Sequence, residues 1–248
     1  MNWLTQCKYE ILRNLRNRRF AFFSVLLPVG FYFLFVNLDG PNMRINGTNW
    51  ASYYMISMAT FSVVGGGLNG MASKIAFERT QGWLRLVQTT PLRPFNYVTT
   101  KIVASLLMNL IQVFILFALA SIFEPVHLTV GIWIISALFI AVGGLVFIVL
   151  GMLIGQLIGM DAANIVASAV YFALSIFGGL WFPVTILPAF LKHVAEGIPT
   201  YHLAHLAWQL AGSHLPTVGD VAILVGYFAL FSLLAIWVTG TRTESRAV

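Results

Sequence analysis

Residues 73–101 read SKIAFERTQGWLRLVQTTPLRPFNYVTTK and form a polar interruption between two apolar blocks of the sequence. The stretch carries five cations against a single acid: Lys74, Arg79, Arg85, Arg93 and Lys101 against Glu78. Most other long segments of the sequence are apolar, with only scattered charges. The stretch is therefore the largest charged surface through which this chain can meet the aqueous phase.

The composition predicts an integral membrane protein made of one domain. Hydrophobic residues make up 59% of the 248 residues and charged residues only 9%, whereas soluble domains carry about 25% charged residues. The net charge of +6 could suggest a nucleic acid partner. We expect none, because the basic residues lie at the ends of apolar blocks, where they set membrane topology. The one cysteine, Cys7, excludes an internal disulfide and a multi-cysteine metal site.

A helix that crosses a bilayer needs about 20 mainly apolar residues. Six blocks meet this requirement and predict an all-α protein with six transmembrane helices: Phe20–Leu38, Trp50–Ala72, Val98–Phe123, Val130–Ile158, Ala162–Phe182 and Val218–Gly240. The fourth block is long enough to tilt or to extend beyond the bilayer. The second block contains serine, threonine and asparagine residues, which is typical of a helix buried among other helices.

The distribution of lysine and arginine predicts that both termini lie in the cytoplasm. With this orientation the inner segments hold twelve of the fourteen basic residues, and the outer segments hold only Arg44 and Lys192. The acidic residues divide equally between the two sides, so the bias is specifically cationic, as the positive-inside rule requires. We therefore expect a multi-pass protein of the cell membrane, in bacteria the inner or plasma membrane. Residues 73–97 would be cytoplasmic and residues 183–217 external.

Residues 1–19 precede the first predicted span and have an amphipathic pattern. Apolar residues recur at helical spacing: Trp3, Leu4, Cys7, Ile11, Leu12 and Leu15. Basic residues lie between them, and such a helix can rest in the inner membrane interface with its cations near anionic membrane lipid. The alternative is a basic anchor before the first span, without an interfacial role.

Two glycine patterns favour helix packing over ligand binding. Gly65–Gly70 fits the dinucleotide pattern G-x-G-x-x-G, but it ends an apolar span and lacks the preceding strand that such a site needs. We therefore expect no nucleotide or other cofactor on this chain. Gly151, Gly155 and Gly159 are spaced by four residues and predict a flat stripe where another helix approaches closely. A pore lining is the alternative for this stripe.

Residues 183–217 form the second long polar interruption, and four prolines divide it. Two segments, Ile186–Glu196 and Tyr201–Ala211, predict short helices whose aromatic and aliphatic content suits a re-entrant or interfacial hairpin. Four side chains could be drawn as a metal site: His193, Glu196, His202 and His205. They lack a complete ligand set at fixed spacing, so we expect hydrogen-bonding roles and no bound metal.

Two motifs carry a resemblance to a known family. The first is Phe77-Glu78-Arg79-Thr80-Gln81-Gly82, followed by Trp83-Leu84-Arg85, Thr90-Pro91-Leu92, Tyr97 and Lys101; the second is Gly178-Gly179-Leu180-Trp181-Phe182-Pro183. Together with the six predicted spans and the outer hairpin, they resemble the ABC type-2 permeases over nearly the whole chain. The resemblance implies that residues 73–97 form a coupling loop that docks on a separate ABC ATPase subunit. It also implies that two permease subunits pair, as a homodimer or a heterodimer.

The resemblance and the residue types together select candidate residues for coupling. We expect Ile75–Gln88 to form a short helix that presents aromatic, charged and glycine contacts to the ATPase: Phe77, Glu78, Arg79, Gly82, Trp83 and Arg85. Exposed aromatic residues beside arginine are typical of a binding surface. The alternative is a solvated basic loop that only fixes topology.

The leading hypothesis is a non-catalytic permease subunit of an ABC exporter, with ATP hydrolysis on a partner chain. Its cargo would be a drug, as in multidrug resistance, a peptide or a lipid-like molecule. A secondary carrier or channel is the first alternative, but ion coupling needs ionisable residues at mid-membrane, and no charged residue of the sequence falls deep within the six blocks. A membrane enzyme is less favoured, because only the outer histidines resemble a reactive cluster.

Overall fold

The computed structural model describes residues 12–13, 22–82 and 94–244. Apart from Leu12 and Arg13, the predicted interfacial helix at residues 1–19 therefore lies outside the described residues. Helices make up most of the described chain, in agreement with the all-α prediction: η1 (Phe22–Leu26, π-helical), α3 (Leu27–Asp39), α4 (Trp50–Thr80), α6 (Pro94–Phe123), α7 (Val130–Gly143), α8 (Leu145–Leu157), α9 (Met160–Phe177), η2 (Val184–Ile186, 3₁₀), α10 (Ala189–Glu196), α11 (Pro199–Ala211) and α12 (Val218–Glu244). A short antiparallel hairpin pairs β1 (Arg44–Ile45) with β2 (Thr48–Asn49).

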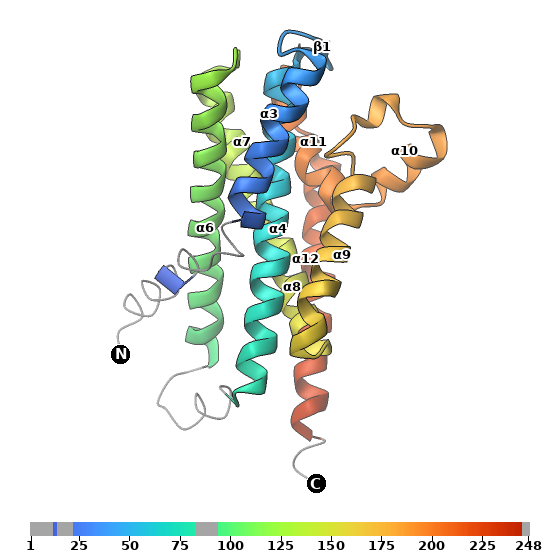
Figure 1. Ribbon diagram of the computed structural model, residues 1–248. Coiled ribbons are helices and arrows are strands. Elements are labelled where there is room, and N and C mark those ends of the chain that lie inside the picture. The colour runs from blue at the N-terminus through green and yellow to red at the C-terminus, as the bar shows by residue number, and fades with distance from the viewer. Residues whose placement is uncertain (1–11, 14–21, 83–93, 245–248) are drawn as a thin grey trace.

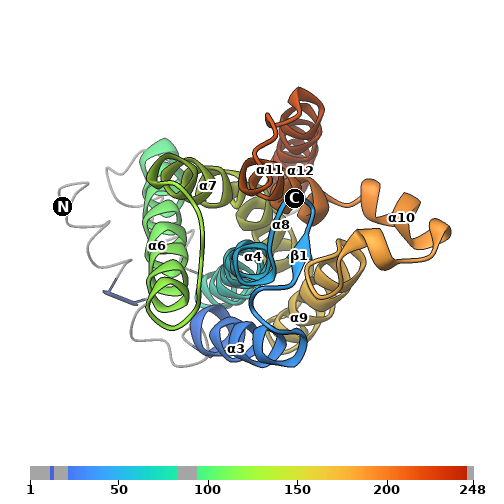
Figure 2. The ribbon, with the colours of Figure 1, turned by 90° about the horizontal axis from the view of Figure 1, so that it is seen from above.

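The long helices pack side by side as a bundle with two distinct ends (Figure 1). At one end α4 and α12 finish and α6 begins; we call this the inner end. The β1–β2 hairpin and α10 lie toward the opposite end, which we call the outer end. Seen along the bundle, α4 occupies the middle and other helices surround it (Figure 2). Each α4 residue from Trp50 to Leu68 is buried, so α4 forms the core of the protein.

Within the described residues, four helical segments are long and apolar enough to cross a membrane: Thr100–Phe123, Val130–Leu157, Met160–Phe177 and Val218–Thr239. This number is smaller than the six spans that the sequence predicts. The first predicted span corresponds to an apolar but shorter helical segment, Ser24–Asp39. The second corresponds to α4, which is long but diluted by glycine and hydroxyl residues.

Several elements differ in their bounds from the predicted ones, three of them by a divided, a shortened or an extended helix. The fourth predicted span is divided into α7 and α8 at Gly144. The fifth ends at Phe177, five residues early, because two glycines follow and Gly179 has a φ of +77°. Residues 75–80, predicted in a separate short helix, instead form the last turns of α4. No proline or glycine occurs between residues 71 and 81 to interrupt that helix.

Three consecutive glycines let α4 contact three neighbouring helices closely. A Cβ on Gly65 would lie 2.7 Å from the ring of Tyr171 on α9. One on Gly66 would lie 2.7 Å from the amide nitrogen of Gln112 on α6, and one on Gly67 would lie 3.1 Å from the Ile148 backbone nitrogen on α8. Successive helical residues point about 100° apart, so each glycine serves a different neighbour. Close helix packing therefore accounts for this glycine run.

Candidate functional site

A buried ion pair joins the inner ends of α4 and α6. The Lys101 ammonium lies 2.8 Å from both carboxylate oxygens of Glu78, and the two side chains are only 1% and 6% exposed. The half-exposed Arg13 guanidinium approaches the same carboxylate at 3.5 Å. Because α4 and α6 flank residues 81–93, the pair holds the two sides of that loop together.

Arg79 connects the inner end of α4 to α8. Its guanidinium donates to the carbonyl oxygen of Gln156 and, at 2.7 Å, to that of Ile158. These carbonyls lie at the C-terminal end of α8, where unpaired carbonyl groups and the helix dipole favour a cation. Neighbouring residues at the end of α4 therefore reach two different helices, α6 through Glu78 and α8 through Arg79.

The remaining candidate coupling residues lie at the surface or outside the described residues. Phe77 is 43% exposed, one turn before the end of α4. Gly82 follows α4 with a φ of +66°, a conformation that residues with side chains rarely adopt. Trp83 and Arg85 belong to the part of the loop that the structure does not describe. The structure thus leaves Phe77 available to a partner and engages Glu78 within the chain.

Sequence reasoning treated Glu78 as a contact for a partner and missed its pairing with Lys101. A signal for the pair was present. Lys101 lies at the start of a long apolar block, where a buried lysine must have a partner. Glu78 is the single acid in residues 73–101, so it was the natural candidate.

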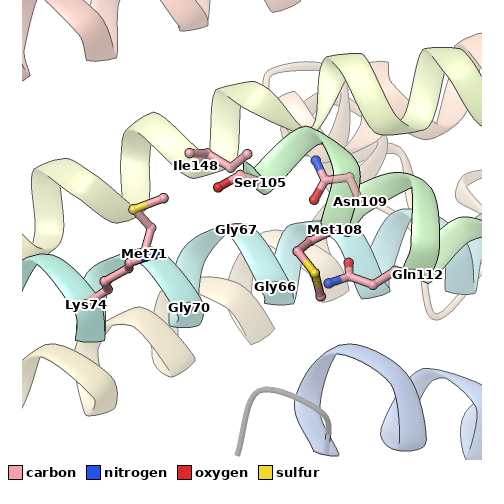
Figure 3. Close-up of a pocket in the computed structure, with 10 residues that line it drawn as sticks. All are labelled: Gly66, Gly67, Gly70, Met71, Lys74, Ser105, Met108, Asn109, Gln112 and Ile148. Carbon is pink, nitrogen blue, oxygen red and sulfur yellow. The ribbon is translucent and has the colours of Figure 1, made fainter. Parts of the chain in front are cut away.

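A small polar cavity lies between α4, α6 and α8 (Figure 3). Its volume is about 20 Å³, and its lining includes Lys74 on α4 and Asn109 and Gln112 on α6. The amide of Gln112 lies against Gly66 and has no hydrogen-bond partner among the described residues. A cavity of this size holds about one water molecule, and a water there would pair with that amide.

Two of the three stripe glycines lie where α8 crosses α4. A Cβ on Gly151 would lie 2.6 Å from the Gly67 carbonyl oxygen, and one on Gly155 would lie 2.5 Å from that of Ala72. Gly159 does not share this contact. It lies beyond the end of α8, because Ile158 is extended (φ −104°, ψ 147°) and ends the helix. No heavy atom in the described part of the chain lies within 4 Å of a Cβ built on Gly159.

At the outer end, a hydrogen-bond network joins α11 to the first turn of α12. The carboxylate of Asp220 faces Nδ1 of His202 at 2.6 Å and Nδ1 of His205 at 2.9 Å. Nε2 of His202 donates to the carbonyl oxygen of Glu196 at 2.7 Å. Both ring nitrogens of His202 are therefore engaged, Nδ1 by the Asp220 carboxylate and Nε2 by the Glu196 carbonyl oxygen. The network fixes the outer hairpin to the last long helix.

The structure separates the four residues that could be drawn as a metal site. His193 is exposed on α10, where its ring lies 3.6 Å from the Glu196 carboxylate. His202 and His205 turn toward Asp220 instead. Across the described ranges, no group of three or more His, Cys, Asp or Glu side chains could hold a metal ion.

A pocket of about 470 Å³ opens beside the histidine network, and we call it the outer pocket. Aromatic rings form much of its wall. The Tyr53 and Trp208 rings stack with centroids 4.7 Å apart, and the Tyr201 ring stacks on His205 at 4.9 Å. The pocket thus combines a rigid aromatic wall with polar groups, as ligand sites commonly do.

Comparisons with known proteins agree with the family that the motifs suggest. The model of a family described as "ABC-2 family transporter protein" matches residues 41–239. The protein named "Putative transport permease YvfS" of Bacillus subtilis (strain 168) is 30% identical over 239 residues, which cover 96% of this chain and 96% of that protein. The family match includes the ion pair at the inner end and the whole of the outer pocket.

Proposed function

The chain belongs to the ABC-2 family of transporter proteins, and from this premise we propose that it is the permease subunit of an ATP-driven exporter. Its cargo would be a drug, a peptide or a lipid-like molecule. A separate ATPase subunit would supply the energy, and the chain itself would be non-catalytic. Two permease subunits would pair, as identical or related copies.

In this proposal six helices cross the cell membrane. The segment Ser24–Asp39 and α4 join the four longer apolar segments as spans. α4 has 31 residues, and at 1.5 Å per residue it exceeds a hydrocarbon core of about 30 Å. Other helices surround α4, so it can cross the membrane without an apolar outer face.

The inner end of the bundle would face the cytoplasm, together with both termini. The support is the placement of basic residues, twelve on the proposed inner side and two on the outer side. In the fold, the end of α4 and the end of α12 lie together at the inner end (Figure 1). Residues 41–49 lie at the opposite end.

One observation carries the coupling proposal: the inner end of α4 is attached on two sides. Glu78 binds Lys101 on α6 at 2.8 Å, and Arg79 binds the last carbonyls of α8. A displacement of residues 81–93 by an ATPase would therefore act on three helices together. In this scheme Phe77, Trp83 and Arg85 contact the ATPase and Gly82 permits its close approach, whereas the Glu78 and Arg79 side chains transmit the movement.

Co-purification of the ATPase and cargo-stimulated ATP hydrolysis in reconstituted vesicles test the proposal. Phe77→Ala should reduce ATPase binding by roughly tenfold or more, as truncation of a central aromatic contact does. Arg79→Gln should keep the ATPase bound but lower cargo-stimulated hydrolysis, because α8 is no longer attached to the moving helix. Phe123→Ala is the matched control, since Phe123 is 65% exposed at the other end of α6.

Two results would count against the proposal. Both variants could bind the ATPase and transport cargo as the unmodified protein does, in which case this loop is not the transmission element. Alternatively, Phe123→Ala could reduce ATPase binding as much as Phe77→Ala, in which case the effect is a general loss of stability.

A further inference from the structure

Two side chains of opposite charge line the outer pocket from α10. Lys192 and Glu196 lie four residues apart, so they are neighbours on one helix face with Cβ atoms about 6 Å apart. One presents an ammonium group and the other a carboxylate. His193 also lies near Glu196, but that pair is well exposed to solvent and holds the carboxylate only weakly. The pocket rim can therefore pair with a ligand that carries one charge of each sign.

The deeper wall adds a hydrogen-bond acceptor. His205 lines the pocket, and its Nδ1 faces the Asp220 carboxylate at 2.9 Å. In the tautomer that donates from Nδ1, Nε2 is a hydrogen-bond acceptor. The Tyr201 ring stacks on this imidazole. Burial, and secondarily the negative charges of Asp220 and Glu196, raises the pKa of the Tyr201 hydroxyl. The negative charges of Asp220 and Glu196 near this wall favour a cationic group that donates hydrogen bonds.

Apolar side chains near the pocket are exposed to the surroundings. Phe182, Ile186 and Phe190 are 47%, 70% and 75% exposed. They lie just before and within α10, which projects sideways from the bundle at the outer end (Figure 1). Exposed apolar residues on a short amphipathic helix are typical of an element that lies in the membrane interface. In the proposed topology this location brings the outer pocket to the level of the lipid head groups.

We propose that the outer pocket binds the head group of a zwitterionic phospholipid with a primary ammonium group, of the phosphoethanolamine type. Lys192 pairs with the phosphate. Glu196 and Nε2 of His205 accept hydrogen bonds from the ammonium, and Trp208 packs against the carbon linker. A phosphocholine head group has no N–H donor, so it makes neither of these hydrogen bonds.

This inference rests on the proposed function in one respect only: the proposed topology decides from which leaflet of the membrane the lipid is taken. The outer pocket lies at the opposite end of the bundle from the ion pair and the coupling loop. A failure of lipid binding would therefore leave the proposed ATP coupling untouched, and a failure of coupling would leave the lipid site in place.

Native mass spectrometry of the full-length chain tests the proposal. The protein is released from nanodiscs that contain equal amounts of phosphatidylethanolamine and phosphatidylcholine, and the retained lipid is identified. We expect phosphatidylethanolamine to be retained over phosphatidylcholine by roughly tenfold, the ratio that one charge-assisted hydrogen bond gives. Equal retention of the two lipids would overturn the proposal.

Variants of two pocket residues test whether the pocket causes the preference for phosphatidylethanolamine. Glu196→Gln should abolish the preference for phosphatidylethanolamine, and Lys192→Gln should weaken the retention of both lipids. Both side chains reach the pocket rim, so neither change should prevent folding. His193→Gln is the matched control on the same helix, because His193 does not line the pocket and its solvent-exposed contact with Glu196 holds that carboxylate only weakly. A Glu196→Gln protein with unchanged preference would place the lipid elsewhere and reject the site.

A competition experiment distinguishes a membrane lipid from a free zwitterion. Soluble phosphoethanolamine is added to the protein in nanodiscs that contain phosphatidylethanolamine. We expect little displacement at a concentration equal to that of the lipid, because the acyl chains hold the lipid in place. Complete displacement at that concentration would show that the pocket takes the free compound and would overturn the lipid assignment.

Discussion

Lys101 is a cation with 1% of its side chain exposed, and Glu78 offsets the cost of its burial. Transfer of an ion from water to a protein interior costs several kcal/mol, and a close partner recovers much of that cost. Such pairs add little net stability compared with two apolar residues of similar size. The important consequence arises when one partner is lost, because the other charge then remains buried after losing this close contact.

Loss of one partner of this pair should therefore lower the free energy of unfolding strongly. Glu78→Gln should cost about 3–5 kcal/mol, and Lys101→Met should fall near the lower end of that range, because Arg13 stays 3.5 Å from the carboxylate. The double change Glu78→Leu with Lys101→Met should recover most of the loss. The heat-denaturation midpoint of the purified protein in detergent measures each variant.

Arg44→Met serves as the control, since Arg44 is exposed in the β1–β2 hairpin and its removal should change the midpoint little. The account fails if the double variant is as unstable as the less stable of the two single variants. It also fails if Glu78→Gln is as stable as the unmodified protein.

Two of the stripe glycines, Gly151 and Gly155, form a close contact between α8 and α4. At Gly155 an added Cβ would meet backbone oxygen at 2.5 Å and the Cβ of Ile75 at 2.9 Å. Backbone atoms cannot rotate away as a flexible side chain can, so the two helices would have to separate. Close backbone approach through small residues is the usual basis of helix association in membranes.

Gly155→Ala should therefore lower stability by about 1–3 kcal/mol, the usual cost of overpacking a well-packed core. Gly159→Ala should have almost no effect, because the space around that position is open among the described residues. Both variants add the same methyl group four residues apart. Equal loss of heat stability in the two variants would contradict the close-contact account.

The four-residue spacing alone could not distinguish these two glycines. The sequence pattern treats Gly151, Gly155 and Gly159 as equivalent, because it assumes an unbroken helix. The structure ends α8 at Leu157, so Gly159 leaves the contact surface. Patterns of residue type predicted that helices pack here, but the end of a helix depends on backbone conformation at Ile158, for which the sequence holds no strong signal.

The candidate site at the inner end shows the same difference between what the sequence predicts and what only the structure reveals. The charge pattern of residues 73–101 identified the polar segment and its neighbours. Lys101 at the start of an apolar block indicated a partner acid, but the contact itself could not be derived from the sequence, because Glu78 and Lys101 are 23 residues apart and meet only when α4 and α6 pack together. Pairing of this kind is a property of tertiary structure.

For the whole molecule, the two ends of the bundle should lie on opposite sides of the membrane. In a Cys7→Ser background, Met43→Cys should react with an impermeant maleimide in intact cells, because Met43 is exposed directly before β1 at the outer end. Gln81→Cys, exposed at the inner end, should react only after the membrane is permeabilised. The basis is the twelve-to-two division of basic residues.

Labelling of Gln81→Cys in intact cells would reverse the proposed orientation. Labelling of both positions in intact cells would mean that the two ends face the same compartment, and the span number would then be wrong. Each variant should first be checked for normal abundance in the membrane, so that failure to react is not mistaken for protection.

The glycine run in the centre of α4 has a geometric property that a single glycine would lack. One screw step of a helix, a rotation of about 100° with a shift of 1.5 Å, replaces each residue by its neighbour in sequence. After such a step Gly66 would face α9 and Gly67 would face α6, in the positions that Gly65 and Gly66 hold now. Two of the three close approaches would still be made by glycine. Of these three contacts, only the one with α8 would lose its glycine, because α8 would meet Leu68 in place of Gly67.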